Sequence, residues 1–371
     1  MALIQYITRI QFDFGAINLL GAEIERLGLR RPLLITDQGV AAAGLLERAL
    51  DAALPCKPVI FDQTPENPTE AALLACLALW EEHGCDGLIA LGGGSALDLS
   101  KAVALITSHG GTLADYDVKT GGSEAIGPVS PQIAIPTAAG TGAEVGRACV
   151  MLDAGGEKRV AVNLNMVANT VICDPELTLT LPAGLTAATG IDALSHGIET
   201  TCSPWFNPPA AAIALDCVRR AAHWLPRAVA DGSDRHARWE MMMAALEGGL
   251  CLQKALGGAH AMANPLGELG VHHGSVIGVL LPHVLAFNEG HAEAAFADLR
   301  AAIGLPAGAS LSQWSADLVA GLGLPQRLSE LGVGADVLEG MASKAARDHL
   351  SATNPRAAQA TDYLRLLEAA H

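Results

Sequence analysis

The sequence is poor in aromatic residues, which make up 4% of its 371 positions, and only 17% of its residues are charged. It also lacks a long apolar run: segments such as 276–281 fall far short of the roughly 20 residues that a membrane-spanning helix needs. The N-terminus lacks the basic and then apolar pattern of a signal peptide. We therefore expect a cytoplasmic protein that does not contact a membrane.

Basic side chains are outnumbered, because 23 Lys and Arg stand against 39 Asp and Glu, a formal net charge of −16. Nucleic-acid binding normally leaves a basic patch, so we expect no nucleic-acid partner. The eight cysteines are scattered, with no CxxC pair and without the density of a disulfide scaffold. Buried, reduced thiols are the expected state.

The length predicts two domains, since single domains usually span about 100–200 residues. In the first half, short aliphatic runs alternate with amphipathic stretches of helical length. We expect strands at 32–36, 58–61, 87–91 and 132–136, and helices at 41–53, 69–83 and 96–107. This alternation is typical of a parallel sheet covered on both faces, whose ligands bind at the carboxyl ends of the strands.

The pattern changes along the rest of the chain. Residues 110–130 are expected to form a loop, and 145–173 to form extended strands joined by the turn Ala154-Gly155-Gly156. Helical spacing then dominates, at 185–202, 209–230, 234–258, 275–287 and 292–303. We predict an α/β domain over residues 1–177 and an all-α domain over residues 178–371, with Asp174, Pro175 and Pro182 near the boundary.

A glycine-rich turn, Gly92-Gly93-Gly94, follows the strand expected at 87–91 and precedes a helix. Glycines let a ligand approach the backbone, and the first N–H groups of a helix favour an anion such as a diphosphate. Ser95, with Asp98 three residues later, is placed to cap that helix. The turn does not match G-x-G-x-x-G, and such turns also occur for purely geometric reasons, so both interpretations stay open.

A second turn of small residues, 136–144, follows the strand expected at 132–136, so two loops should face one another at the carboxyl edge of the sheet. Two such loops suit a dinucleotide. Asp37 follows the strand at 32–36, where its carboxylate could accept a hydrogen bond from a ribose hydroxyl and repel a 2′-phosphate. From position alone, a helix cap is the simpler role for Asp37.

Two potential metal ligands, Asp192 and His196, stand four residues apart in a stretch expected to be helical, so they share one helix face. His260 and the pair His272-His273 follow. Three imidazoles and one carboxylate suit iron(II) or zinc. Each histidine alone also fits a buried or surface position without a metal, but His196 and His260 lie in apolar stretches, where an unpaired polar group is costly.

In their order, these motifs resemble the iron-containing (group III) alcohol dehydrogenase family. The resemblance extends from about Phe12 to Arg356 and implies a dinucleotide-binding α/β domain followed by a helical metal-binding domain, the plan shared with dehydroquinate synthase. It rests on Gly92-Gly93-Gly94-Ser95 with Asp98 and Lys101, Pro136-Thr137 with 140–144, Asp174-Pro175, 190–193 with His196, and His260 with 265–267 and His273-Gly274.

The resemblance implies a metal, Fe(II) or in its place Zn(II), bound by Asp192, His196, His260 and His273. His273 is chosen over His272 because the ligand of the family directly precedes a glycine. The resemblance also implies the cofactor NAD(H). Its contacts are then Asp37 at the ribose, Gly92, Gly93, Gly94 and Ser95 at the diphosphate, and Asp98, Thr137, Thr141 and Lys158 nearby.

Within the family, residues 12–15, 67–70 and 253–257 are most similar to members that interconvert 4-hydroxybutyrate and succinate semialdehyde. We therefore expect an alcohol dehydrogenase or aldehyde reductase for a small anionic primary alcohol or aldehyde, and a homo-oligomer, with a dimer as the simplest case. Lys254 and Arg147 are candidate anchors for the substrate carboxylate, although both also fit as solvated or ion-paired surface residues. A phosphonate or sulfonate aldehyde fits equally well.

One position departs from the family pattern, because Asn264 stands where the family usually has a second histidine four residues after the ligand. An amide does not titrate near neutrality, so His272 or a water chain would have to carry the proton. The departure equally fits a different substrate or an altered member with a binding role. A sugar-phosphate cyclase related to dehydroquinate synthase is disfavoured, because the helical half has few basic residues near the proposed metal.

Overall fold

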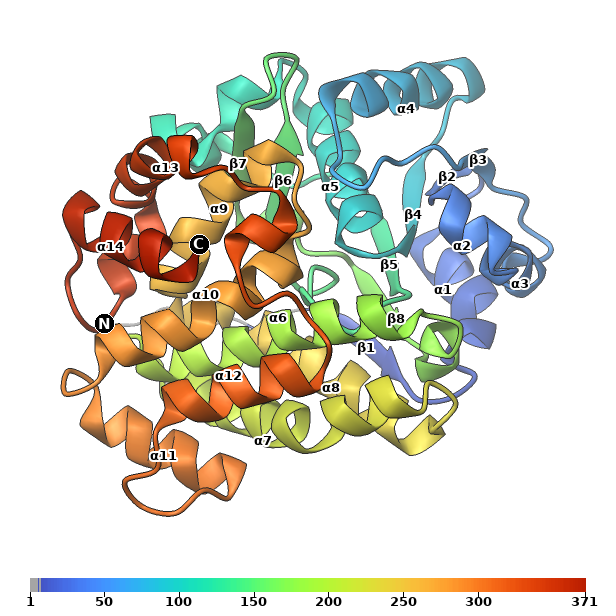
Figure 1. Ribbon diagram of the computed structural model, residues 1–371. Coiled ribbons are helices and arrows are strands. Elements are labelled where there is room, and N and C mark those ends of the chain that lie inside the picture. The colour runs from blue at the N-terminus through green and yellow to red at the C-terminus, as the bar shows by residue number, and fades with distance from the viewer. Residues whose placement is uncertain (1–5, 7) are drawn as a thin grey trace. The chain divides into compact units, whose positions relative to one another are not determined.

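The computed structural model describes Tyr6 and residues 8–371 (Figure 1). Its internal contacts divide the chain into two compact units. The first, here called the sheet unit, contains the described residues of 6–138 together with 143–180. The second, the helical unit, contains residues 139–142 and 181–371.

The sheet unit is built on a six-stranded, wholly parallel sheet with the order β1-β8-β5-β4-β2-β3. Its strands are β1 (Arg9–Phe12), β2 (Pro32–Ile35), β3 (Val59–Phe61), β4 (Gly87–Gly92), β5 (Gln132–Pro136) and β8 (Thr170–Cys173). Its helices are α1 (Leu20–Leu27), α2 (Gln38–Ala42), α3 (Leu45–Ala53), α4 (Glu70–His83) and α5 (Gly94–His109). A separate antiparallel hairpin joins β6 (Ala148–Leu152) to β7 (Lys158–Val162).

Both faces of the parallel sheet are buried, because alternate residues of each strand pack into different cores. On one face Leu34 and Ile89 join the apolar side chains of α1 and α3. On the other face Leu33 and Leu88 join those of α4, α5 and the hairpin. Helices on both faces explain why the strands are apolar throughout rather than alternating.

The helical unit contains α6 (Ala183–Cys202), α7 (Pro208–Ala230), α8 (Arg235–Cys251), α9 (Gly258–Leu266), α10 (His273–Asn288), α11 (Glu293–Ile303), α12 (Leu311–Gly321), α13 (Leu338–Ala345) and α14 (Ala360–Ala370). Helix α10 is apolar on all sides and contributes to two cores. Leu281 and Leu285 pack with α6, α7, α8, α11 and α12. Val276 and Leu280 pack with α9, α13 and α14.

The predicted fold class, a parallel α/β part followed by an all-helical part, is confirmed. Two predicted helices were too long. The stretch 41–53 is interrupted at Gly44, which adopts a left-handed conformation with φ of 76° and separates α2 from α3. The stretch 234–258 ends at Cys251, and a 3-10 turn, Leu252–Lys254, separates it from α9. Among the described residues, no helix has the length and apolar character needed to cross a membrane.

Candidate active site

Helix α6 carries Asp192 and His196 one turn apart on the same face, as their spacing predicts. Its glycines allow neighbouring helices to approach closely. A Cβ at Gly190 would collide with Leu225 of α7, and a Cβ at Gly274, the residue after His273, would collide with the Ala188 carbonyl of α6. The His-Gly pair therefore brings the start of α10 directly against α6.

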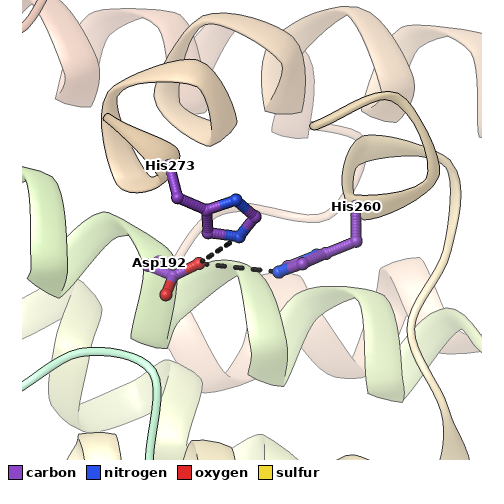
Figure 2. A group of neighbouring side chains, drawn as sticks. All are labelled: Asp192, His260 and His273. Carbon is purple, nitrogen blue, oxygen red and sulfur yellow. Dashed lines mark ion pairs between the residues drawn. The ribbon is translucent and has the colours of Figure 1, made fainter. Parts of the chain in front are cut away.

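The three predicted histidine ligands face one oxygen of the fourth ligand, Asp192 Oδ1. The ligand atoms of Asp192, His260 and His273 all lie within 4.8 Å of one another, and His196, which is not one of that group, faces the same oxygen. The Nε2 atoms of His196, His260 and His273 lie 3.7, 3.5 and 3.6 Å from it. Figure 2 shows His260 and His273 pointing at Asp192 from α9 and α10. The His260 ring lies between the other two, with ring centroids 4.9 Å from His196 and 5.4 Å from His273.

This arrangement fits a divalent metal ion. Asp192 Oδ1 and His260 Nε2 are buried, face one another, and have no hydrogen-bond partner within the described chain. Buried polar atoms without a partner are costly, and an ion between them would satisfy both. Three imidazoles and a carboxylate suit Fe(II) or Zn(II). Asp192, His196 and His260 are almost fully buried, whereas the His273 side chain is 34% exposed, so the cluster opens beside His273.

Burial and charge set the ionisation of this cluster. Burial opposes the charged form of Asp192, but His196, His273 and His260 outweigh it and hold its pKa well below the ordinary value. Burial lowers the pKa of His196 to about 4. Near neutral pH the carboxylate is therefore ionised and the His196 imidazole is neutral, and both are the forms that bind metals. Burial opposes the charged form of His260, but Asp192 and Glu199 outweigh it and raise its pKa to about 9, so a metal would have to displace a proton from this ring.

The glycine turn after β4 leaves the start of α5 open. Gly93 precedes the helix and has no side chain to cap it, and no atom lies within 4 Å of the place that a Cβ would take there. The predicted cap by Ser95 and Asp98 is wrong. Ser95 lies inside the helix and its hydroxyl donates to the Glu66 carbonyl, while Asp98 accepts from Val150 N at 3.0 Å.

Asp37 borders this turn and also caps a helix. Its Oδ1 accepts from Val40 N at 2.9 Å at the start of α2, and its Oδ2 lies 3.4 Å from the place of a Cβ on Gly92. Thr137 N donates to Gly92 O at 3.0 Å, so the loops that follow β4 and β5 begin side by side, as predicted. The two proposed roles of Asp37 are therefore compatible, because each uses a different oxygen.

The remaining predicted cofactor residues divide between the units. Lys158 begins β7 in the sheet unit, and its charge acts on Asp98. Thr141 is exposed and belongs to the helical unit. Asp37, the glycine turn and Thr137 thus lie at the carboxyl ends of β2, β4 and β5, and Ser95 follows at the start of α5. Asp98 faces the hairpin that carries Lys158.

Comparison with known proteins agrees with this site. The family described as iron-containing alcohol dehydrogenase matches residues 8–175, and the C-terminal part of the Fe-containing alcohol dehydrogenase family matches residues 186–371. The chain belongs to the iron-containing alcohol dehydrogenase family. It is therefore an oxidoreductase of the iron-type alcohol dehydrogenases.

Relatives in this family differ in their substrates. The 4-hydroxybutyrate dehydrogenase of Cupriavidus necator is 46% identical over 99% of both chains. The choline dehydrogenase of Bacillus subtilis (strain 168) is 34% identical over 94% of this chain and 90% of its own. A crystal structure of sulfoacetaldehyde reductase from Bifidobacterium kashiwanohense in complex with NAD+ has a TM-score of 0.90 and 26% identity, and covers 100% of this chain and 98% of that one.

Lys254 does not fit its predicted role as an anchor for a substrate carboxylate in this alcohol dehydrogenase. It is buried, and its Nζ donates to three carbonyls at the end of α6, those of Thr200, Thr201 and Ser203, at 2.7, 3.2 and 2.6 Å. An ammonium group has three N–H donors, and all three are used here. Lys254 is therefore a cap for the C-terminus of α6.

The other three predicted residues have different surroundings. Arg147 is partly buried; burial alone lowers its pKa, and no carboxylate among the described residues pairs with it. Asn264 donates from Nδ2 to Asp348 Oδ2 at 2.9 Å. His272 precedes α10 and its Nδ1 lies 3.4 Å from Ser275 Oγ. The role of His272 in proton transfer stays a prediction.

Two residues beside the metal cluster were missed by the sequence analysis. Glu199 lies on α6, three residues after His196, and its Oε2 is 2.6 Å from His260 Nδ1. Asn354 accepts from Gly258 N at the start of α9. The helical spacing from His196 to Glu199 is a signal that could have identified Glu199, but Asn354 is 96 residues from its partner in the sequence.

Proposed function

We propose that this alcohol dehydrogenase interconverts 4-hydroxybutyrate and succinate semialdehyde, with NAD(H) as redox cofactor and Fe(II), or Zn(II) in its place, as bound metal. Residues 1–177 form the NAD(H)-binding domain and residues 178–371 the metal-binding domain. The observation that carries the proposal is the convergence of three histidines on Asp192 Oδ1. The similarity to the Cupriavidus necator 4-hydroxybutyrate dehydrogenase supports the substrate.

The cofactor proposal rests on the sheet unit. The uncapped start of α5 offers backbone N–H groups to a diphosphate, and the nearby Oδ2 of Asp37 offers an acceptor to a ribose hydroxyl. The same carboxylate would repel the 2′-phosphate of NADP(H). A solved relative of similar fold is a complex with NAD+.

A divalent ion held by Asp192, His196, His260 and His273 would supply a Lewis acid that eases loss of the hydroxyl proton, and NAD(H) would accept or deliver the hydride. The protein supplies the geometry. Asp192 contributes the single negative charge, burial of three of the four ligands excludes water, and the more exposed His273 side admits a small alcohol. Asn264 cannot titrate and is held by Asp348, so it would orient rather than transfer a proton.

Arg147 is the residue that we assign to the substrate carboxylate. A partly buried guanidinium that lacks a carboxylate partner within the described chain is ready to bind an anion. Arg147→Met should raise KM for succinate semialdehyde about tenfold or more, since a charge-assisted contact is worth roughly 1.5–3 kcal/mol. Reduction of butanal, which has no carboxylate, is the control and should change little. An equal effect on both aldehydes would exclude Arg147 as the anchor.

The function is tested with purified protein loaded with Fe(II) or Zn(II) and a panel of short aldehydes, each with NADH and NADPH. We expect NADH-linked reduction of succinate semialdehyde with a kcat/KM at least about tenfold above that of butanal. Preference for sulfoacetaldehyde or a phosphonate aldehyde would keep the anionic substrate class and change the acid group. No NADH-linked turnover with any aldehyde would overturn the proposal.

We also propose a homodimer, which sedimentation of the purified protein checks.

A further inference from the structure

The start of α9, which carries His260, is capped by residues that are distant in sequence. Gly257 precedes the helix and has no side chain of its own. Glu199 Oε1 accepts from Ala259 N at 2.7 Å, and Asn354 Oδ1 accepts from Gly258 N at 3.1 Å. A Cβ on Gly257 would lie 3.1 Å from both oxygens, so glycine leaves room for both acceptors to reach the helix.

The second oxygen of Glu199 contacts the His260 ring, with 2.6 Å between Oε2 and Nδ1. An ionised carboxylate only accepts hydrogen bonds, so Nδ1 must carry the proton of this contact. The lone pair of a neutral His260 imidazole is then on Nε2, the atom that faces Asp192 Oδ1 at 3.5 Å. A hydrogen bond of this kind fixes both the tautomer and the orientation of a ligating histidine.

We infer that Glu199 is a positioning residue for the metal, which holds His260 in the ligating tautomer and at the same time fixes the backbone that carries it. The inference rests on the proposed function only in taking the Asp192 and histidine cluster as the metal site. Glu199 is almost fully buried and lies on α6 with Asp192 and His196. One helix therefore supplies two ligands and orients a third.

Glu199→Gln separates this role from simple helix capping, because it nearly preserves the shape and makes one oxygen an NH2 donor. If the NH2 group faces His260, Nδ1 must accept, and the proton moves to Nε2, which cannot then bind a metal. If the NH2 group faces Ala259 N instead, two donors oppose one another and the helix start loses its acceptor. The first orientation is favoured, because the Ala259 N–H can only donate whereas the imidazole can move its proton to Nε2, so metal binding weakens. Asn354→Ser is the matched control, because it weakens the same helix start without touching His260.

The test titrates the metal-free full-length protein with Co(II) and follows the visible d–d absorption, with thermal unfolding of the metal-free forms alongside. We expect Glu199→Gln to bind Co(II) about 10–100-fold more weakly than the unmodified protein and with a changed spectrum. Asn354→Ser should unfold at a lower temperature but bind Co(II) within about twofold of the unmodified protein, with the same spectrum. Glu199→Asp, which keeps the charge but shortens the reach, should bind with intermediate affinity, and it replaces Glu199→Gln if that variant does not fold.

The Co(II) titration can contradict either the role of Glu199 or the metal site itself. If the unmodified protein binds Co(II) and Glu199→Gln binds it with equal affinity and the same spectrum, Glu199 is only a helix cap and the inference is wrong. If the unmodified protein shows no d–d absorption with Co(II), the metal site of the proposed function is wrong, and the inference falls with it.

Discussion

Asp37 uses its two carboxylate oxygens differently, and a single substitution separates them. Oδ1 caps α2 through Val40 N, and Oδ2 lies beside Gly92. Asn caps helices as well as Asp does, so Asp37→Asn should leave stability within about 0.5 kcal/mol. Removing the charge should raise kcat/KM with NADPH relative to NADH about tenfold, because a like-charge repulsion with the 2′-phosphate is lost. An unchanged ratio in an equally stable variant would show that Asp37 does not face the ribose.

Ala255 is the one non-glycine residue with positive φ in the described chain, with φ of 65° and ψ of 171°. This region is almost restricted to glycine, and a residue held there costs about 1–3 kcal/mol. Ala255→Gly should therefore stabilise the protein by about 1 kcal/mol, part of the gain being offset by the greater freedom of glycine in the unfolded chain. Denaturant unfolding measures the change. The control Ala78→Gly, at an exposed position of α4, should destabilise by about 1 kcal/mol.

At the scale of elements, the 3-10 turn Leu252–Lys254 and the end of α6 hold one another. Lys254 Nζ binds three carbonyls at the end of α6, and in return Thr200 Oγ1 donates to the Ala255 carbonyl at 3.2 Å. Lys254→Met should lower the free energy of unfolding by about 2 kcal/mol or more, because buried carbonyls lose their donors. KM for succinate semialdehyde should stay within about twofold. A tenfold rise in KM without loss of stability would instead restore Lys254 as a substrate anchor.

The sequence predicted most elements because their apolar patterns are local. Strands β2, β4 and β5 and helices α4, α6 and α7 lie close to their predicted bounds, since each is a continuous run or a clear helical spacing. The breaks at Gly44 and Cys251 were missed, because a left-handed glycine and a 3-10 turn leave the apolar spacing on both sides intact. Strand β1 was not predicted, because Arg9 and Gln11 interrupt its apolar residues and none of its four residues is fully buried.

The residues of the active site likewise divide into those that a local sequence pattern reveals and those that only the folded chain brings together. Asp192 and His196 could be paired from their spacing, and His260 and His273 from their motifs, because each ligand carries its own local signal. Glu199 shares the helical spacing of His196 and could have been identified from it, but its partner at the start of α9 could not, and no local pattern marks Asn354. Lys254 was misassigned because its neighbours in sequence do not show that the end of α6 already uses its charge.

The pH dependence of stability sums over both units, and its two sides have different causes. In the sheet unit burial opposes ionisation of Glu23, but bonds from Arg26, Gln11, Arg9 and Thr170 lower its pKa to about 2, so its contribution is present above pH 4.5 and is lost as the pH falls towards 2. In the helical unit burial, together with Asp216, raises the pKa of Glu247 to about 8. Between pH 4.5 and 8 the folded state then binds more protons than the unfolded state. The free energy of unfolding therefore falls as the pH rises through that range.

Glu247→Gln isolates the alkaline side. Glu247 lies on α8, with its Oε1 3.4 Å from Arg220 Nε of α7, and the charges of Asp216 and Arg219 also act on it. Glu240 pairs with the same Arg220. A protonated carboxyl can donate to Asp216, whose charge raises the pKa of Glu247, and a Gln amide can donate in the same way without ionising. At pH 5 the two proteins should be equally stable within about 0.5 kcal/mol, and at pH 9 the variant should be more stable by about 1 kcal/mol or more.

Burial also raises the pKa of Glu144 to about 7, but this group is present in both proteins, so the difference between the two unfolding curves reports Glu247 alone. If that difference is the same at pH 5 and pH 9, Glu247 is ionised in the folded state throughout the range, and its pKa is not raised by folding.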